Sequence, residues 1–206
     1  MVVINNGINF DEYKEFQQNN RSELGIPEDM FVVGAVGRLT KQKAPETFVK
    51  MAKYIKNVIP NAFFVMVGDD IGDGLYRKKT ELMIEEANLT NSVLITGWVD
   101  VPLKYIACFD VATLLSRWEG FGLVLPEYML MGKPIVATKA DAIPYVVGNA
   151  GILVDIDDYN QAAEAVVSIY RDSKMRLKLI ENGKERVKSY DAQRMAYEHV
   201  TLFHTL

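Results

Sequence analysis

The sequence of 206 residues lacks several features that would place it in a specialised class. With a single cysteine it cannot form an internal disulfide, and Cys108 stands in an apolar helical context that favours burial and packing. His199 and His204 have no cysteine or carboxylate cluster at ligand spacing around them, which argues against a zinc site. No apolar run is long enough to cross a bilayer and no signal peptide opens the chain, so we expect a cytoplasmic protein without a transmembrane segment.

A basic block and the common nucleotide-binding glycine motifs are also missing. The net charge is -4 and the isoelectric point is near 5.3, which argues against a general nucleic-acid binder because no basic block exists to neutralise a phosphate backbone. Neither Gly-x-Gly-x-x-Gly after the first predicted strand nor Gly-x-x-x-x-Gly-Lys-Ser is present, so the usual dinucleotide and phosphate-loop sites are not predicted. The hydrophobic content of 49% nevertheless suffices for one domain with a substantial core.

What the sequence does contain is a regular alternation of apolar strand patterns with helical patterns. The predicted strands cover residues 31–37, 62–68, 93–96, 111–115, 134–138 and 152–154. The predicted helices cover residues 45–58, 75–88, 101–109, 126–131, 159–171, 174–188 and 192–204, with a short element at 143–147. This alternation predicts the α/β class, with a doubly wound, Rossmann-like parallel sheet of about six strands and helices on both faces. One domain then spans residues 1–206, with an opening segment at 1–20 and a C-terminal helix within 190–206.

Residues 116–127 carry the densest chemistry in the chain, two glutamates separated by a glycine-containing loop. Gly120 and Gly122 would let the backbone approach a ligand, and free amides of the loop and the helix start would attract negative charge. Glu119 and Glu127 would face the same crevice, where carboxylates accept hydrogen bonds from sugar hydroxyls. The stretch therefore predicts a ligand with phosphates and hydroxyls, although Glu127 alone is explained equally well as an acid favoured in a first helical turn.

Basic residues follow the first predicted strand, in the loop 38–45. Arg38 and Lys43 suit a phosphate, whereas Lys41 is interpreted as a solvated surface residue. In the commonest doubly wound order, 3-2-1-4-5-6, ligands bind between the carboxyl ends of strands 1 and 4, which is where the loops 38–45 and 116–127 would meet. The acidic loop 69–74 does not match the calcium-loop pattern and is interpreted as a flexible turn.

Taken in order, these motifs resemble those of the donor-binding, C-terminal half of retaining GT-B glycosyltransferases, the group 1 class that includes glycogen and sucrose synthases. The resemblance covers nearly the whole chain and is carried by Asn6-Gly7-Ile8 with Phe16, Gly37-Arg38-Leu39 with Lys43, Gly68-Asp69, Gly97, Asp110, Ser116 with Glu119-Gly120-Phe121-Gly122-Leu123, Glu127, Gly132-Lys133-Pro134-Ile135-Val136-Ala137, and Gly151-Ile152-Leu153-Val154. Three departures bear on donor-sugar selectivity more than on fold. Ala44 stands where a glycine often follows the phosphate lysine, Leu115 stands where a proline is frequent, and Ala142-Ile143-Pro144-Tyr145 stands where many relatives have Gly-Gly-Ile-Pro-Glu.

The resemblance implies that a sugar is transferred, with retention, from a UDP-, GDP- or ADP-sugar to an acceptor hydroxyl. Arg38 and Lys43 would hold the diphosphate and stabilise the leaving group, so that no metal ion and no other cofactor would be required. Glu119 would contact the donor sugar, Glu127 would accept hydrogen bonds from the ribose, and the backbone of residues 97–99 would lie against the base. The residues implied to be catalytic are Arg38, Lys43 and Glu119, and those implied to bind the donor are Gly37, Gly97, Trp98, Val99, Ser116, Gly120, Phe121, Gly122, Leu123 and Glu127.

The N-terminal acceptor domain of the family is absent from this chain, so we expect a fragment that binds its donor weakly and is inactive alone. That domain would supply the site for a glycan, lipid or small-molecule acceptor, and any contact with the cytoplasmic face of a membrane. Two alternatives stay open, a nucleotide-sugar binding module without transferase activity and an epimerase-type GT-B relative that acts on the sugar nucleotide itself. A purely structural or interaction domain is a third alternative, which the converging charges disfavour.

Overall fold

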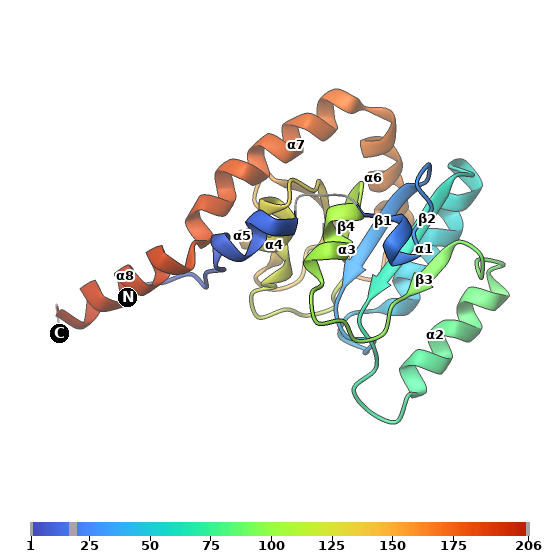
Figure 1. Cartoon of the computed structure of the whole chain (residues 1–206), viewed down its shortest axis with the longest axis horizontal. Coiled ribbons are helices and arrows are strands. Elements are labelled where there is room, and N and C mark those ends of the chain that lie inside the picture. The colour runs from blue at the N-terminus through green and yellow to red at the C-terminus, as the bar shows by residue number, and fades with distance from the viewer. Residues whose placement is uncertain (1, 17–19, 205–206) are drawn as a thin grey trace.

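The protein, described over residues 2–16 and 20–204 by a computed structural model, is built on one six-stranded sheet (Figure 1). The strands are β1 (Phe31–Val36), β2 (Ala62–Val67), β3 (Val93–Ile95), β4 (Val111–Leu114), β5 (Ile135–Thr138) and β6 (Gly151–Val154). All pairs are parallel, and the order is β3-β2-β1-β4-β5-β6. The predicted doubly wound α/β fold and its strand order are therefore confirmed, and the order reverses between β1 and β4.

The central strands are buried on both faces, and successive residues point into two different hydrophobic clusters. In β1, Val32 packs into one cluster, whereas Phe31 and Val33 pack into the other. In β5, Ile135 and Val136 divide in the same way. Burial on both faces explains why these strands read as continuous apolar runs and not as alternating patterns.

The helices follow the predicted order with small changes at their ends. They are α1 (Pro45–Val58), α2 (Leu75–Glu86), α3 (Leu103–Cys108), α4 (Val124–Leu130), α5 (Ile143–Val147), α6 (Tyr159–Arg171), α7 (Ser173–Arg186) and α8 (Ala192–His204), with the 3-10 helices η1 (Phe10–Phe16), η2 (Ser22–Leu24) and η3 (Val187–Tyr190). Gly122 takes a left-handed conformation with φ +78° and Leu123 caps the helix, so α4 begins two residues before Pro126. Within the described residues, none of these helices combines the length and apolar character needed to cross a membrane.

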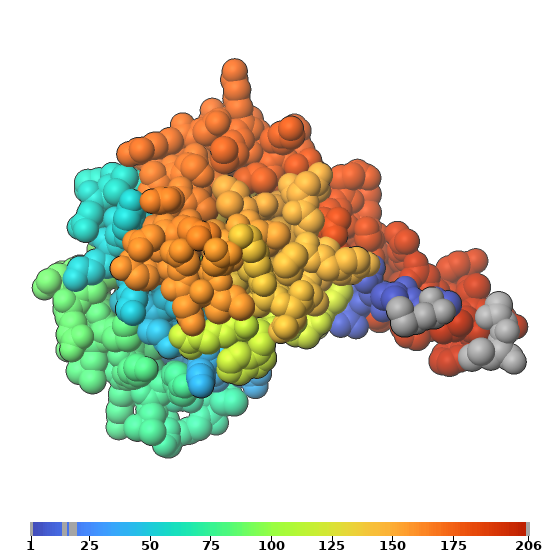
Figure 2. All heavy atoms as spheres, turned by 180° about the vertical axis from the view of Figure 1, so that it is seen from behind, coloured from blue at the N-terminus to red at the C-terminus, as the bar shows by residue number. Residues whose placement is uncertain are grey.

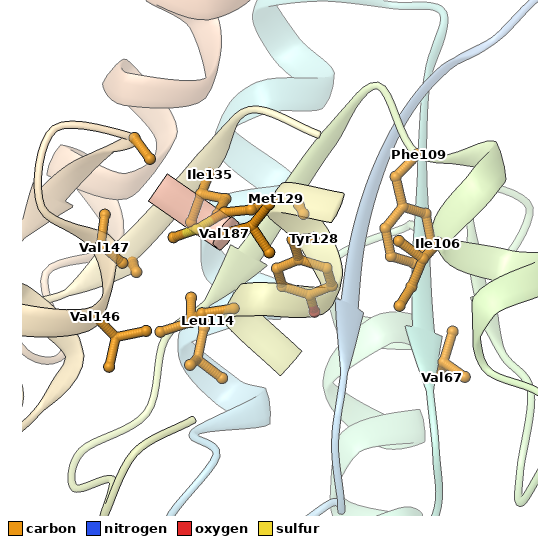
Figure 3. Close-up of a cluster of buried hydrophobic side chains, with 14 of the residues drawn as sticks. Val67, Ile106, Phe109, Leu114, Tyr128, Met129, Ile135, Val146, Val147 and Val187 are labelled. Atoms are coloured by element: carbon orange, nitrogen blue, oxygen red, sulfur yellow. The ribbon is translucent and has the colours of Figure 1, made fainter. Parts of the chain in front are cut away.

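Helices cover both faces of the sheet. One cluster of buried side chains joins the sheet to α1, α2 and α6, and the other joins it to α3, α4, α5 and η3. Figure 3 shows the second cluster, in which Tyr128 and Met129 of α4 lie between Ile135 and the side chains of Ile106 and Phe109. Phe109 comes so close to β1 that a Cβ atom on Gly34 would lie 2.2 Å from its ring, so this strand position requires glycine.

A buried arginine ties the segment before β1 to the amino end of β4. Arg21 is 8% exposed and donates hydrogen bonds of 2.9 Å to the carbonyl groups of Glu28, Met30 and Cys108. It also donates to the Asp110 carboxylate at 2.9 Å, and the same carboxylate oxygen accepts from a main-chain amide of β1 at 2.7 Å. These contacts fix the amino ends of the two central strands, opposite the edge where a ligand is expected.

The two ends of the described chain meet on one side of the molecule. Ile8 donates to the Tyr190 carbonyl at 2.8 Å and accepts from the Ala192 amide at 3.0 Å. None of the residues of α8 is buried, and Figures 1 and 2 show this helix projecting from the body with the N-terminal residues beside it. The opening segment, for which the sequence predicted no helix, forms η1 and packs Tyr13 into the core cluster.

Candidate functional site

The site lies where the carboxyl ends of β1 and β4 come together. The two strands pair in register, with Ala35 opposite Thr113. Below their ends, the buried hydroxyl of Tyr128 from α4 accepts from the Val36 amide at 2.9 Å and donates to the Thr113 carbonyl at 3.3 Å. The hydroxyl satisfies main-chain groups of both strands, so their carboxyl ends are held at a fixed separation. The two loops that the sequence selected therefore start side by side.

Three of the predicted side chains meet directly at this edge. The Lys43 ammonium forms an ion pair with Glu119 through Oε2, and the Ser116 hydroxyl donates to the same oxygen at 3.3 Å. The side chains of the pair are 18% and 13% exposed. The loop after β1 and the loop after β4 are thus joined by a cation and a carboxylate with little access to water, where electrostatic interactions are stronger than at an open surface.

Gly37 and Arg38 lie beside Lys43, around a small hollow of about 30 Å³ at the end of β1. Arg38 is exposed, so its guanidinium can reach a ligand from solvent. A Cβ atom on Gly68 would lie 2.3 Å from the Gly37 carbonyl oxygen, which shows how closely the loops after β1 and β2 pack. Arg38 and Lys43 both carry donors and positive charge at this edge, which suits an anionic ligand.

The glycine loop leads from Glu119 into α4. Gly120 is exposed, and a Cβ atom added there would meet no atom within 4 Å, so the loop is open to a ligand. Phe121 packs edge-to-face on Tyr190 with ring centroids 5.5 Å apart, whereas Leu123 is 48% exposed. Because α4 has only seven residues, the charge that would attract an anion comes chiefly from the basic side chains and not from a helix dipole.

Glu127 lines a different hollow, a groove of about 570 Å³. The groove is lined by Asn9, Asp11, Glu12, Tyr13, Phe16, Asp100, Val101, Pro102, Leu103 and Glu127. Neither Lys43 nor Glu119 lines this groove, so Glu127 faces a hollow in which the other glutamate takes no part. Burial raises the pKa of Glu127 to about 6, and a hydrogen bond with the Tyr13 side chain opposes this rise. The pKa of Tyr13 is raised as well, by its burial and then by the nearby Glu127 carboxylate.

Residues 97–99 come in the sequence directly before Asp100 to Leu103, which line the groove. Gly97 has φ +73° and forms an isolated bridge with Gly68, so it fixes the turn after β3. Trp98 is 62% exposed, and Val99 packs partly against the core. The backbone predicted to meet a base therefore leads into the groove that contains Glu127.

Three residues with contacts to the site were not singled out from the sequence. Tyr13 belongs to a segment that has no periodic pattern, and Arg117 makes its contacts with residues far away along the chain. Asp141 accepts from the Glu119 amide at 2.9 Å and has a positive φ of 40°. Its position in the sequence could have identified Asp141, because Asp141 and Ala142 come directly before an Ile-Pro pair and occupy two positions at which family members often have glycine.

Within the described residues, no group of three or more histidine, cysteine, aspartate or glutamate side chains is arranged to hold a metal ion. Of the charged groups predicted to bind a ligand, Arg38 is an exposed guanidinium and Lys43 is paired with Glu119. The residues present can bind an anion directly through Arg38 and Lys43, and hydroxyl groups through Glu119 and Glu127.

Comparison with known proteins identifies the family of the chain. The family described as glycosyl transferases group 1 matches residues 16–186. The chain is 31% identical, over 205 residues, to a UDP-Gal:alpha-D-GlcNAc-diphosphoundecaprenol alpha-1,3-galactosyltransferase of Escherichia coli, covering 92% of this chain and 51% of that protein. It is 28% identical, over 169 residues, to the lipopolysaccharide core biosynthesis glycosyltransferase LpsE of Rhizobium meliloti, covering 81% and 47% of the two chains. The chain therefore spans about half the length of the curated relatives that it matches.

Solved structures show the same correspondence. Anabaena HepE, crystallised with UDP and glucose, superposes with a TM-score of 0.90 at 25% identity, covering 100% of this chain and 57% of that chain. The C-terminal domain of the glycosyl transferase group 1 protein LpcC from Francisella tularensis gives a TM-score of 0.81 at 26% identity, covering 90% of this chain and 100% of that domain. With the family match extending over most of its length, the chain belongs to the glycosyl transferases group 1 family.

Proposed function

We propose that this chain is the donor-binding half of a retaining glycosyltransferase, which moves a sugar from a nucleoside-diphosphate sugar to an acceptor hydroxyl. The observation that carries the proposal is the meeting of Lys43, Glu119 and Ser116 at the carboxyl ends of β1 and β4, with Arg38 exposed beside them. This is the edge of a doubly wound sheet at which ligands bind. The complex of the related HepE with UDP supports a uridine nucleotide as the first donor to test.

Each charged side chain has a separate task in this proposal. Arg38 and Lys43 bind the diphosphate and stabilise the negative charge that accumulates on it as the bond between the sugar and the phosphate oxygen breaks. Glu119 accepts hydrogen bonds from the hydroxyls of the donor sugar, while Glu127, in the neighbouring stretch of α4, accepts from the ribose. The acceptor oxygen forms the new bond on the same face of the sugar, and its proton passes to the leaving phosphate.

The ion pair between Lys43 and Glu119 explains how the free site tolerates two partly buried charges. Each charge compensates the other before a ligand arrives, which avoids the cost of an unpaired ion. A diphosphate carries a higher negative charge than a carboxylate, so it would draw the Lys43 ammonium toward itself. Glu119 would then turn its carboxylate to the hydroxyls of the sugar.

In this proposal, the acceptor site and the full transfer activity require a second half of the enzyme, which is outside this chain. The curated relatives are about twice as long as the part that this chain matches, and a donor held on one lobe alone stays open to water. The 206 residues should accordingly bind a donor weakly and give negligible turnover. A glycan, a lipid or a small molecule would be the acceptor.

Calorimetric titration of the chain with UDP-, GDP- and ADP-glucose tests the proposal. Arg38→Ala is the informative variant, because substituting Lys43 would also leave Glu119 without its cation. We expect Arg38→Ala to weaken donor binding about tenfold, the effect of losing one hydrogen bond between charged groups. Lys41→Ala, which removes an exposed cation from the same loop, is the matched control and should bind normally.

Two results would refute the proposal. One is the absence of binding for all three nucleotide sugars at millimolar concentration. The other is an Arg38→Ala variant that binds as tightly as Lys41→Ala. The addition of a chelator to the binding assay examines the expected independence from metal ions, and binding should not change. Donor-dependent transfer by a longer polypeptide that includes the acceptor half would separate a transferase from a binding module.

A further inference from the structure

Arg117 lies two residues before Glu119, and its side chain connects the loop after β4 to three other segments. Nε donates to both carboxylate oxygens of Asp157, at 3.0 and 2.9 Å. One terminal nitrogen donates to the Lys41 carbonyl at 2.7 Å, and the other donates to Glu46 Oε1 at 2.9 Å. The side chain is 19% exposed, so the guanidinium is directed into the protein and not toward solvent.

The main chain around Arg117 adds contacts to the loop after β1. Its amide donates to the Gln42 carbonyl at 2.8 Å, and the Gln42 side-chain amide donates to the Trp118 carbonyl at 2.9 Å. The next residue on one loop is Lys43, and the next residue on the other loop is Glu119. The partners of the central ion pair are therefore each one residue away from the hydrogen bonds that join the two loops.

Asp157 gives this arrangement a rigid support. Its carboxylate also accepts from the Thr47 hydroxyl at 3.0 Å, and its backbone has φ +62°, a conformation that non-glycine residues adopt only where their surroundings impose it. The hydrogen bonds from Arg117 hold the pKa of Asp157 below its usual range. Arg117 is thus anchored on the loop before α6, outside the two loops that it joins.

We propose that Arg117 is a positioning residue that sets Lys43 and Glu119 at the separation needed to bind the diphosphate and sugar of a donor together. The inference rests on the proposed function and adds to it a residue that touches no ligand. The planar guanidinium is essential to the role, because it presents donors in fixed directions to three acceptors. A lysine at position 117 would keep the positive charge but could not hold Asp157, Glu46 and the loop carbonyl in one geometry.

An ordinary stabilising ion pair is the competing interpretation of Arg117, and it predicts different measurements. An ion pair of that kind adds a little to stability and has the same effect on the affinity for every ligand. A positioning role instead predicts a loss of affinity that is larger for a ligand that contacts both loops than for one that contacts a single loop. UDP-glucose would reach Lys43 and Glu119 together, whereas UMP lacks the second phosphate and the glucose.

The experiment compares Arg117→Gln and Arg117→Lys with the unsubstituted chain. Arg194→Gln, which removes an exposed ion pair with Glu198 on α8, is the matched control. Amide hydrogen exchange is measured for peptides covering residues 38–44 and 116–121, and calorimetry gives the affinities for UDP-glucose and UMP. Thermal unfolding midpoints are recorded for all variants.

We expect both Arg117 variants to exchange faster in both peptides than the control does. Affinity for UDP-glucose should fall about tenfold, a change of about 1.4 kcal/mol, while affinity for UMP changes by less than about threefold. Unchanged exchange in these peptides would overturn the inference. So would an equal loss of affinity for the two nucleotides together with a lower unfolding midpoint. If the unsubstituted chain binds no nucleotide sugar, the proposed function fails, and hydrogen exchange alone then decides whether Arg117 positions the loops.

Discussion

Replacing Glu127 by glutamine should make the protein more stable at neutral pH, although it removes a group assigned to ligand binding. Glu127 lines the groove beside Tyr13, and burial raises its pKa from 4.5 to about 6. Above that pH the folded protein must hold a carboxylate in surroundings that favour the protonated form. Glutamine has the same shape and no charge, so it avoids this cost.

The sign and size of the effect follow from proton linkage. Between pH 4.5 and about 6 the folded state binds more protons at Glu127 than the unfolded state does, so stability falls as the pH rises through this window. The difference between the two pKa values, at about 1.36 kcal/mol per pKa unit, gives a loss of about 2 kcal/mol that is complete above pH 7. The Glu127→Gln variant lacks this loss.

Urea unfolding at several pH values between 4.5 and 8 measures the effect. The difference in unfolding free energy between Glu127→Gln and the unsubstituted protein cancels the titration of the other groups. It should grow by about 2 kcal/mol from pH 4.5 to pH 8 in favour of the variant. Glu164→Gln, which removes an exposed carboxylate from α6, supplies the baseline. A difference that stays constant with pH, or that favours the glutamate at pH 8, would refute the reasoning.

Two further predictions concern the strands that carry the site. Gly34→Ala would place a Cβ atom 2.2 Å from the Phe109 ring and should lower the unfolding free energy by about 2–4 kcal/mol. The double variant Gly34→Ala with Phe109→Leu should recover part of that loss. Equal stability of the single variant and the unsubstituted protein would contradict the close packing. Arg21→Leu should lower the unfolding free energy by about 2–4 kcal/mol, because the partly exposed Asp110 and three carbonyl groups lose their hydrogen bonds to the guanidinium. Denaturant unfolding measures the change. A loss of unfolding free energy no larger than that of Arg194→Gln would contradict this role.

The sheet was predictable because its signals are local and redundant. Each strand is a short apolar run, and turn or polar residues separate it from the next helix. The strand order was taken from the commonest doubly wound arrangement, and it proved correct. Given that order, Arg38 and Lys43 had to emerge next to the loop that carries Glu119, and the structure confirms this placement of the two loops.

The contacts that organise the site were not predictable from the sequence. Arg117 forms hydrogen bonds with residues that are 40 to 76 positions away in the chain, and no periodic pattern in the sequence predicts such contacts. Tyr13 lies in a polar opening segment, yet tertiary packing leaves its side chain only 7% exposed and places it against Glu127. Packing across the fold decided the environment of both residues, whereas spacing along the chain identified the charged groups themselves.

At two positions where the family pattern favours glycine, the backbone is left-handed, and this explains what glycine would contribute there. Ala44 has φ +49° and Asp141 has φ +40°, a conformation that costs about 1 kcal/mol or more for a residue with a side chain. The structure nevertheless keeps both turns. Ala44 is fully buried at the start of α1, and the Asp141 carboxylate accepts from the Glu119 amide at 2.9 Å. The two side chains therefore change the stability of the loops more than their course. At position 141, a hydrogen bond from the main-chain amide of Glu119 to the Asp141 carboxylate thus accompanies a backbone conformation that glycine would adopt without strain.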